Sequence, residues 1–231
     1  MQQNSQPSAE PSLPKGATVQ VKICGLTRVA EAVACAQAGA RAIGCVFYSG
    51  SPRHVDTAVA AEIRRALPPG IACVGVFVDE SFRNVMRIVD RTGFAAVQLH
   101  GNETPEFAAR LNRERIFVIK ALFLNRAPGI AEAPQFPASV FLVECGKGPL
   151  PGGNARTWNW GEAAPFGERH PLILAGGLTP ENAAQAVRAA SPDAIDVSSG
   201  VEAGPGRKDL RKVEQLIAAV SAAKARRTIF A

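Results

Sequence analysis

Short apolar runs and longer amphipathic runs alternate along most of this 231-residue chain. Eight runs rich in Val, Ile, Leu, Ala and Phe recur at intervals of roughly 25 residues, which is typical of strands in repeated βα units. Because these runs are almost wholly apolar, they predict parallel strands that are buried on both faces. The expected strands are Val19–Cys24, Ala42–Phe47, Ala72–Val78, Ala95–Leu99, Phe117–Ala121, Val140–Glu144, Leu172–Ala175 and Ala194–Val197.

Ala- and Arg-rich stretches with helical spacing lie between most of these strands. Two connections have weaker patterns, because prolines interrupt the fifth and little periodicity follows Trp160 in the sixth. The sequence therefore predicts one α/β domain, a parallel eight-stranded (β/α)8 TIM barrel with weak fifth and sixth helices. A doubly wound sheet is the alternative, but no Gly-x-Gly-x-x-Gly motif follows the first strand. The expected helices are Val29–Ala38, Ala58–Leu67, Phe82–Arg91, Pro105–Asn112, Glu181–Ala190 and Leu210–Ala223.

The start of the chain differs in composition from the rest. Residues 1–17 consist mainly of Gln, Ser, Pro and Asn, and we interpret them as a disordered tail that precedes a barrel domain over residues 18–231. They lack the cationic start and apolar run of a secretory signal, and no apolar stretch reaches the ~20 residues that span a membrane. The five cysteines form no CxxC pair, so neither a disulfide framework nor a zinc site is expected. This cysteine pattern predicts a cytoplasmic location.

The formal net charge is +6. Lys and Arg are spread along the chain, and no aromatic residues interleave with the one dense run, Lys224–Arg227. A nucleic-acid partner is therefore not expected. We interpret the surplus charge as solvated helix faces together with a few cations for an anionic ligand.

Polar residues follow most of the expected strands, and in a barrel these positions line one mouth. A lone cysteine is more often a small buried hydrophobe, but so many polar residues at one mouth indicate a functional site. Asp79, near Glu80 and Ser81, is interpreted as a cap for the next helix and not as a site residue. The strand-end residues are Cys24, Arg53, His54, Asp79, His100, Glu144, Gly176–Gly177, Asp196 and Ser198–Gly200.

Two turns of small residues follow the seventh and eighth expected strands. They contain Gly176 and Gly177 in the first, and Ser198, Ser199 and Gly200 in the second. Backbone N–H groups of the loops after these two strands form the usual phosphate site of the fold. The first turn also predicts a helix start, with Thr179 as N-cap and Pro180 in the first turn. A phosphorylated small molecule is the expected ligand.

Five segments carry a resemblance to a known family. In the same order, they are similar to the signature segments of phosphoribosylanthranilate isomerases of tryptophan biosynthesis, and the similarity runs from about residue 19 to about residue 217. The resemblance implies an Amadori rearrangement of N-(5-phosphoribosyl)anthranilate to 1-(2-carboxyphenylamino)-1-deoxyribulose 5-phosphate, without metal or other cofactor, in a monomer or homodimer. The segments are Lys22–Thr27, Val74–Val78, Val97–Gly101, Leu174–Leu178 and Ile195–Glu202.

The resemblance also implies roles for particular residues. Cys24 matches the family's general base, and Arg53 matches an arginine associated with the anthranilate carboxylate. His100 and Asp196 lie in signature segments and either orient the substrate or form structural hydrogen bonds. Gly176, Gly177, Ser198, Ser199 and Gly200 would bind the phosphate.

The position of the general acid departs from the family pattern. The family has an aspartate at the end of the sixth strand and a Gly-Gly-Thr/Ser-Gly loop after it. Here the residues are Glu144 and the loop Gly152–Ala155. The glutamate keeps the carboxyl group but moves it by about 1.5 Å. Glu144 is the expected acid, and the alternative is that another group donates the proton. Two other functions stay open: an isomerase of another phosphorylated aminoaldose, and a non-catalytic phospho-ligand-binding barrel.

Overall fold

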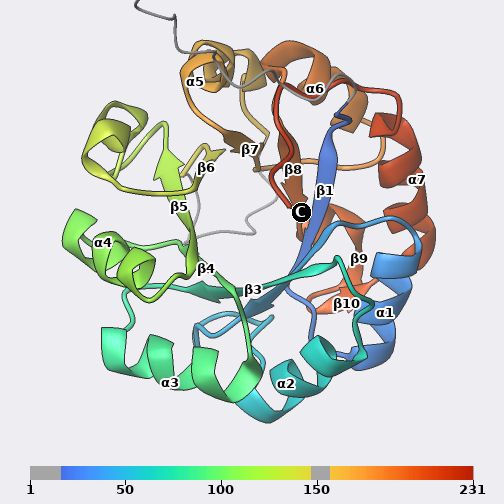
Figure 1. Cartoon of the computed structure of the whole chain (residues 1–231). Coiled ribbons are helices and arrows are strands. Elements are labelled where there is room, and N and C mark those ends of the chain that lie inside the picture. Colours follow the sequence, from blue (N-terminus) through green and yellow to red (C-terminus); the bar gives the residue numbers. More distant parts are fainter. Residues whose placement is uncertain (1–16, 147–156, 231) are drawn as a thin grey trace, which may run out of the picture.

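Eight parallel strands close into a barrel in which each strand pairs with the next and β8 pairs with β1. The structure, a computed structural model, describes residues 17–146 and 157–230 (Figure 1). The predicted (β/α)8 barrel is confirmed. The strands are β1 (Gln20–Cys24), β2 (Ala42–Val46), β3 (Ala72–Phe77), β4 (Ala96–Leu99), β5 (Phe117–Phe123), β6 (Val140–Glu144), β7 (Leu172–Leu174) and β8 (Ala194–Val197).

Helices surround the barrel and cover the outer face of the strands (Figure 1). Four of them begin at a side chain that accepts a hydrogen bond from the first turn: Asp56, Ser81, Thr104 and Asp209. Such caps satisfy backbone N–H groups that have no partner inside the helix. The α-helices are α1 (Val29–Gln37), α2 (Thr57–Ala66), α3 (Phe82–Thr92), α4 (Pro105–Arg113), α5 (Ala164–Arg169), α6 (Ala183–Ala190) and α7 (Leu210–Val220).

The fifth and sixth connections are weakly helical, as predicted. A 3₁₀ helix, η1 (Ile130–Gln135), follows β5 and contains Pro134, which removes a backbone donor. After β6, the described chain resumes at residue 157 and forms a short 3₁₀ helix, η2 (Trp160–Ala163), that leads into α5. The loop Gly152–Ala155 lies outside the described residues.

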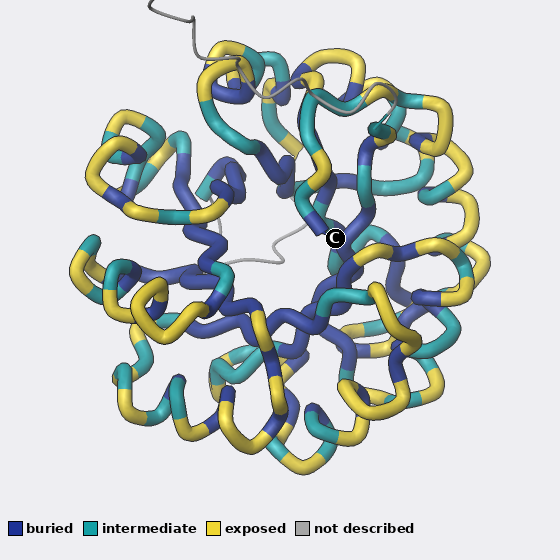
Figure 2. The backbone as a smooth tube through the Cα atoms, viewed as in Figure 1, coloured by how far each residue is buried: buried dark blue, intermediate teal, exposed yellow. Residues whose placement is uncertain are grey.

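Side chains of most barrel strands alternate between two apolar cores. Residues such as Val21 and Ile23 face the helices, whereas Ala42, Val74 and Ile119 belong to a second cluster inside the barrel. Figure 2 shows the strands buried around the barrel axis and the exposed residues on the outer helices. In β1, Lys22 and Cys24 alternate with Val21 and Ile23 and take the positions that face the inside of the barrel. The inside of the barrel is therefore not uniformly apolar at this strand.

Strand β2 places small residues beside β1, and β8 places a carboxylate there. Lys22 pairs with Ala42 of β2 and with Asp196 of β8, and Cys24 pairs with Gly44. A short hairpin, β9 (Glu202–Gly204) and β10 (Arg207–Lys208), follows a 3₁₀ turn, η3 (Ser199–Val201), after β8. It brings Lys208 back beside β8, where the Nζ atom lies 3.2 Å from the carbonyl oxygen of Ser198.

Residues 226–230 form a strap at the amino-terminal end of the barrel strands, which we call the C-terminal strap. The side chain of Gln20 donates to the carbonyl of Phe230 and accepts from the amides of Ile229 and Phe230 at 2.6–2.8 Å. Phe230 packs into the cluster inside the barrel, and Arg227 pairs with Asp193 at 3.1 Å. Part of the basic run near the end of the sequence therefore anchors this strap.

Of the predicted tail, only Ala17 lies within the described residues, and its carbonyl accepts a hydrogen bond from Ala225 at 2.9 Å. None of the helices in the two described ranges is long and apolar enough to cross a membrane.

Candidate active site

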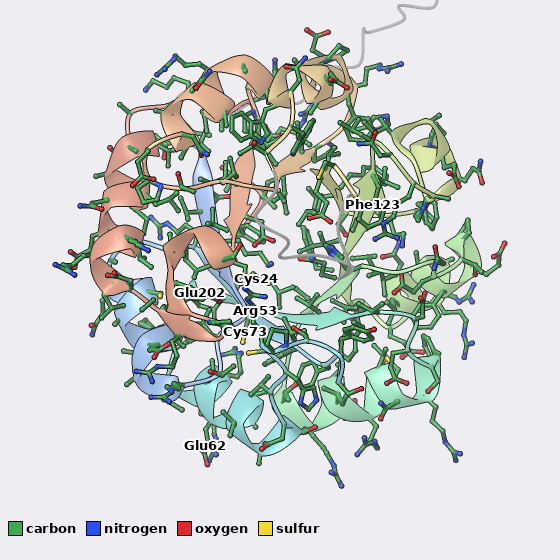
Figure 3. The ribbon with its side chains drawn as sticks, turned by 180° about the vertical axis from the view of Figure 1, so that it is seen from behind. Cys24, Arg53, Glu62, Cys73, Phe123 and Glu202 are labelled. Carbon is green, nitrogen blue, oxygen red and sulfur yellow. The ribbon has the colours of Figure 1, made fainter. Side chains whose placement is uncertain are left out.

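The carboxyl ends of the strands gather most of the predicted site residues at one mouth. Cys24 ends β1, Glu144 ends β6, and His100 follows β4, and all three side chains are buried. Figure 3 shows Cys24, Arg53 and Glu202 close together near the barrel centre, with Phe123 at a distance from them and Glu62 on the outer surface. The edge of His100 packs against Phe123, with 5.6 Å between the ring centroids.

Cys24 lies beside a buried ion pair. Lys22 is two residues earlier in β1, so both side chains point into the barrel. Lys22 is fully buried, and its Nζ atom donates to Asp196 Oδ1 at 2.8 Å. A Cβ atom at Gly44 would lie 2.7 Å from Cys24 Sγ and 3.1 Å from Lys22 Nζ, so the missing side chain provides the space for both groups.

Burial and charge act in opposite directions on this cluster. Burial raises the pKa of the Cys24 thiol, and the positive charge of Lys22 offsets part of that effect. For Lys22, burial works to lower the pKa, but the carboxylate of Asp196 and the nearby Cys24 outweigh it, so the pKa lies above its usual value. Lys22 is therefore a cation at neutral pH. Sequence reasoning missed this lysine, although a charged residue two positions from Cys24 in an apolar strand was a usable signal.

His100 connects β4 to Glu144. Its Nδ1 atom lies 2.8 Å from the side-chain Nε2 of Gln98, and its Nε2 atom lies 3.5 Å from Glu144 Oε1. The latter contact falls short of hydrogen-bond geometry, so His100 Nε2 is buried without a hydrogen-bond partner among the described residues, and Gln98 Oε1 is another such atom. Buried polar atoms of this kind are unusual and are candidates to bind a ligand.

Arg53 already holds a carboxylate of this chain. Its Nε and Nη2 atoms donate to Glu202 at 2.9 and 2.8 Å, and Lys208 donates to the same carboxylate at 2.7 Å. Burial works to raise the pKa of Glu202, but its hydrogen bond from Arg53 and the charge of Lys208 reverse this, so the pKa is lowered. Sequence reasoning missed both partners, although Glu202 lies in a signature segment.

Glycines shape the two small-residue turns. Gly176 and Gly177 have positive φ angles of 91° and 69°, which residues other than glycine rarely adopt. A Cβ atom at Gly200 would lie 1.8 Å from the carbonyl oxygen of Leu178, so only glycine brings the two turns this close. The buried hydroxyl of Ser198 has no hydrogen-bond partner within the described residues.

Two tryptophans join the residues after β6 to the first of these turns. The indole N–H of Trp158 donates to the carbonyl of Ala175 at 2.9 Å, and that of Trp160 donates to Gly176 at 3.0 Å. The two indoles therefore hold the carbonyl groups at the end of β7.

Two local predictions at the mouth are wrong. Helix α6 begins at Ala183 and not near Thr179, because the Asn182 side chain accepts from Thr179 N and donates to Gly177 O, which makes a separate turn before the helix. Asp79 does not cap α3, whose cap is Ser81. It accepts instead from the amide of Asn102 and so joins the loops after β3 and β4.

No three His, Cys, Asp or Glu residues of the described chain are grouped so that they could hold a metal ion. Cys24, Cys35, Cys45 and Cys73 are buried free cysteines, and Cys145 is buried as well.

The comparisons with known proteins agree with this geometry. A family model described as N-(5'phosphoribosyl)anthranilate (PRA) isomerase matches residues 21–219. The chain is 50% identical over 199 residues to the N-(5'-phosphoribosyl)anthranilate isomerase of Desulfatibacillum aliphaticivorans, covering 86% of this chain and 91% of that protein. The chain belongs to this family.

Solved structures give the same relationship in three dimensions. The phosphoribosyl anthranilate isomerase of Thermotoga maritima is 36% identical, with a TM-score of 0.80 over 88% of this chain and 98% of that one. A further isomerase structure, also 36% identical and covering 88% of this chain and 98% of its own, has a TM-score of 0.76 and is a complex with reduced 1-(o-carboxyphenylamino)-1-deoxyribulose 5-phosphate.

The predicted family and enzyme class are thus confirmed: the chain is an isomerase of tryptophan biosynthesis. Within this isomerase family, the glutamate that ends β6 lies where the family resemblance leads one to expect an aspartate. Its side chain is buried at the mouth beside His100, so the longer carboxyl group still lies among the other site residues.

Proposed function

We propose that Cys24 is the general base and Glu144 the general acid of the Amadori rearrangement of N-(5-phosphoribosyl)anthranilate. The observation that carries this proposal is the placement of a buried thiol and a buried carboxyl group at the carboxyl ends of β1 and β6. These strands are not neighbours in the barrel, so a furanose ring has room between the two groups. Acid and base on opposite sides of a substrate suit a reaction that needs both.

Two proton transfers lead to an enolamine intermediate. Glu144 donates a proton to the ring oxygen as the C1′–O bond breaks, and the nitrogen lone pair forms an iminium with C1′. The Cys24 thiolate then takes the proton from C2′, and the electrons of that C–H bond form an enolamine. Tautomerisation of the enolamine to the ketone returns a proton to C1′. The sum is an isomerisation, because no electron pair or heavy atom is gained or lost.

The remaining predicted residues bind the substrate in this proposal. The turns with Gly176 and Gly177 and with Ser198, Ser199 and Gly200 take the phosphate, because glycine and serine let backbone N–H groups approach an anion. His100 and Asp196 lie beside the acid and the base, where they orient the sugar. Arg53 binds the anthranilate carboxylate, and since Glu202 occupies Nε and Nη2, the carboxylate uses Nη1 or displaces Glu202.

We also infer that the enzyme works in a reducing cytoplasm, because its five cysteines form no CxxC pair and no pattern of a disulfide framework. A small phosphorylated molecule is the partner that the site residues favour. Nucleic acid is not proposed as a partner, since Arg227 of the basic run is engaged by Asp193.

The test is an assay of the purified chain with phosphoribosylanthranilate, whose aromatic ring gives a fluorescence signal. Cys24→Ala, Cys24→Ser and Glu144→Gln should each lower kcat by roughly 10²–10⁴ and leave KM similar, because proton transfers act in the transition state. Glu144→Asp should keep measurable activity, since it retains the carboxyl group.

Two matched variants control for general damage. Cys35→Ala removes another buried thiol, and Glu162→Gln changes an exposed carboxylate on η2, so both should have near wild-type kcat. Wild-type turnover by Glu144→Gln would mean that another group is the acid. A wild-type chain that binds phosphoribosylanthranilate without converting it would favour the non-catalytic barrel, and conversion of a different aminoaldose alone would favour the other isomerase.

A further inference from the structure

A fully buried lysine in the middle of a barrel strand needs an explanation. Lys22 has no exposed surface, although lysine is among the residues least often fully buried. It forms an ion pair with Asp196 at 2.8 Å, but in buried pairs of this kind the cost of desolvation can exceed the electrostatic gain. The reaction as proposed above gives Lys22 no role.

The position of Lys22 points to Cys24. Both side chains extend from β1 into the barrel, and the residues paired with them in β2 are Ala42 and Gly44. The point that a Cβ atom of Gly44 would occupy lies 2.7 Å from Cys24 Sγ and 3.1 Å from Lys22 Nζ. The thiol and the ammonium therefore occupy one gap that β2 leaves open.

Three charged groups face the thiol from the elements around it. Lys22 from β1 and Lys208 from β10 favour the thiolate, and Asp196 from β8 disfavours it. Lys22 has the largest of these three effects, and it is the cation that shares the gap with the sulfur. On β2, Cys45 also lies near Cys24, but it interacts most strongly with Cys73.

We propose that Lys22 is a positioning residue for Cys24. The ammonium of Lys22, held in place by Asp196, stabilises the Cys24 thiolate that accepts the substrate proton. This rests on the proposed role of Cys24 as the base. When the thiol loses its proton, the ammonium lies between two anions, the sulfur and the carboxylate. Lys22 is not itself the base, because Asp196 keeps it protonated.

The first test measures the reactivity of the Cys24 thiol, independently of catalysis. Wild-type protein is treated with methyl methanethiosulfonate over a pH series, and modification of the peptide that contains Cys24 is followed by mass spectrometry. In Lys22→Met the pH midpoint of modification should rise, and the rate at neutral pH should fall about tenfold for each unit of that rise.

Because Lys22→Met leaves Asp196 without its partner, the double variant Lys22→Met/Asp196→Asn removes the pair as a unit. In this double variant, the pH midpoint of Cys24 modification should also lie above that of wild type, since the effect of Lys22 on the thiol is larger than that of Asp196. Lys120→Met is the matched control. It removes another fully buried lysine, paired with Glu103 at 2.7 Å, and should leave the Cys24 midpoint unchanged.

The second test separates positioning from a structural role. In Lys22→Met, kcat should fall at least tenfold at neutral pH with a similar KM, and should recover as the pH is raised, because the thiolate then forms without the ammonium. A Cys24 midpoint that is unchanged in both Lys22 variants overturns the proposal, whatever happens to kcat. Failure of the proposed function shows differently, as wild-type turnover by Cys24→Ala.

Discussion

Arg53 and Glu202 meet side by side, with Nε 2.9 Å from Oε1 and Nη2 2.8 Å from Oε2, although 149 positions separate them in the sequence. Two parallel N–H donors on one carboxylate form the strongest common type of ion pair. Lys208 adds a second cation to the same carboxylate at 2.7 Å. The three buried groups sum to one positive charge at the mouth where we propose that the anionic substrate binds.

Glu202→Gln should destabilise the protein strongly. It leaves Arg53 and Lys208 buried without their carboxylate, and breaking a buried pair in this way costs about 3–5 kcal/mol. Urea unfolding at pH 7 measures the loss of free energy. Glu162→Gln, an exposed change, should stay within about 0.5 kcal/mol of wild type. Equal stability of the two variants would show that the Glu202 network contributes nothing.

The loss of stability in Glu202→Gln should depend on pH. Because the pKa of Glu202 is lowered in the folded state, its contribution to stability is full above the unfolded pKa of about 4.3 and is lost as the pH falls through the folded pKa. The difference in unfolding free energy between wild type and Glu202→Gln should therefore shrink on acidification below about pH 4. A difference that stays constant from pH 7 to pH 3 would contradict this.

The rate should rise with pH through the neutral range. Burial raises the pKa of the Cys24 thiol, so the thiolate is a minor species at pH 7 and increases about tenfold per pH unit. A plot of log kcat/KM against pH should have a rising limb that continues beyond pH ~8.5, the usual pKa of cysteine. If kcat/KM is already level below pH 7, the thiol is not the group that titrates.

The first phosphate turn should not accept a branched side chain. Gly177→Val forces valine into a φ of 69° beside the proposed phosphate site, so KM for the phosphorylated substrate should rise at least tenfold. Gly70→Val is the matched control, because Gly70 has a similar φ of 81° but an added Cβ would meet nothing within 4 Å. It should lower stability and leave KM unchanged. Equal KM values in the two variants would place the phosphate elsewhere.

The C-terminal strap should stabilise the barrel without affecting turnover. Phe230→Ala removes a buried aromatic ring from the inner cluster, which typically costs about 3–5 kcal/mol. Gln20→Ala removes three hydrogen bonds to the strap, each contributing about 1 kcal/mol. Thermal unfolding should show a lower Tm for both, with kcat and KM at 25 °C near wild type. An unchanged Tm would mean that the strap is only loosely held.

Local patterns predict most of this fold. Strands that are buried on both faces must be apolar, so runs such as Ala72–Phe77 are visible in the sequence. Pro134 weakens the fifth helix through its own missing donor, which is also a local effect. Cys24 and Glu144 are found at the mouth because each ends a strand that the pattern predicts.

Contacts between distant segments could not be predicted in the same way. Nothing near Lys22 in the sequence indicates that Asp196 neutralises it, since 174 positions separate them and only barrel closure pairs β1 with β8. The helix after Thr179 begins late because Asn182 folds back on Gly177, and that choice depends on side-chain hydrogen bonds rather than on propensity. The interaction of Asp79 with Asn102 likewise needs two loops to meet.

The two tryptophans give this enzyme its own optical reporter. The whole chain contains two tryptophans and one tyrosine, and both indoles are hydrogen-bonded to carbonyls beside the proposed phosphate turns. Almost all of the intrinsic emission therefore arises at the mouth. A substrate that binds at this mouth should therefore change the tryptophan emission. Binding and turnover become separable in one cuvette, even for variants whose chemistry has stopped.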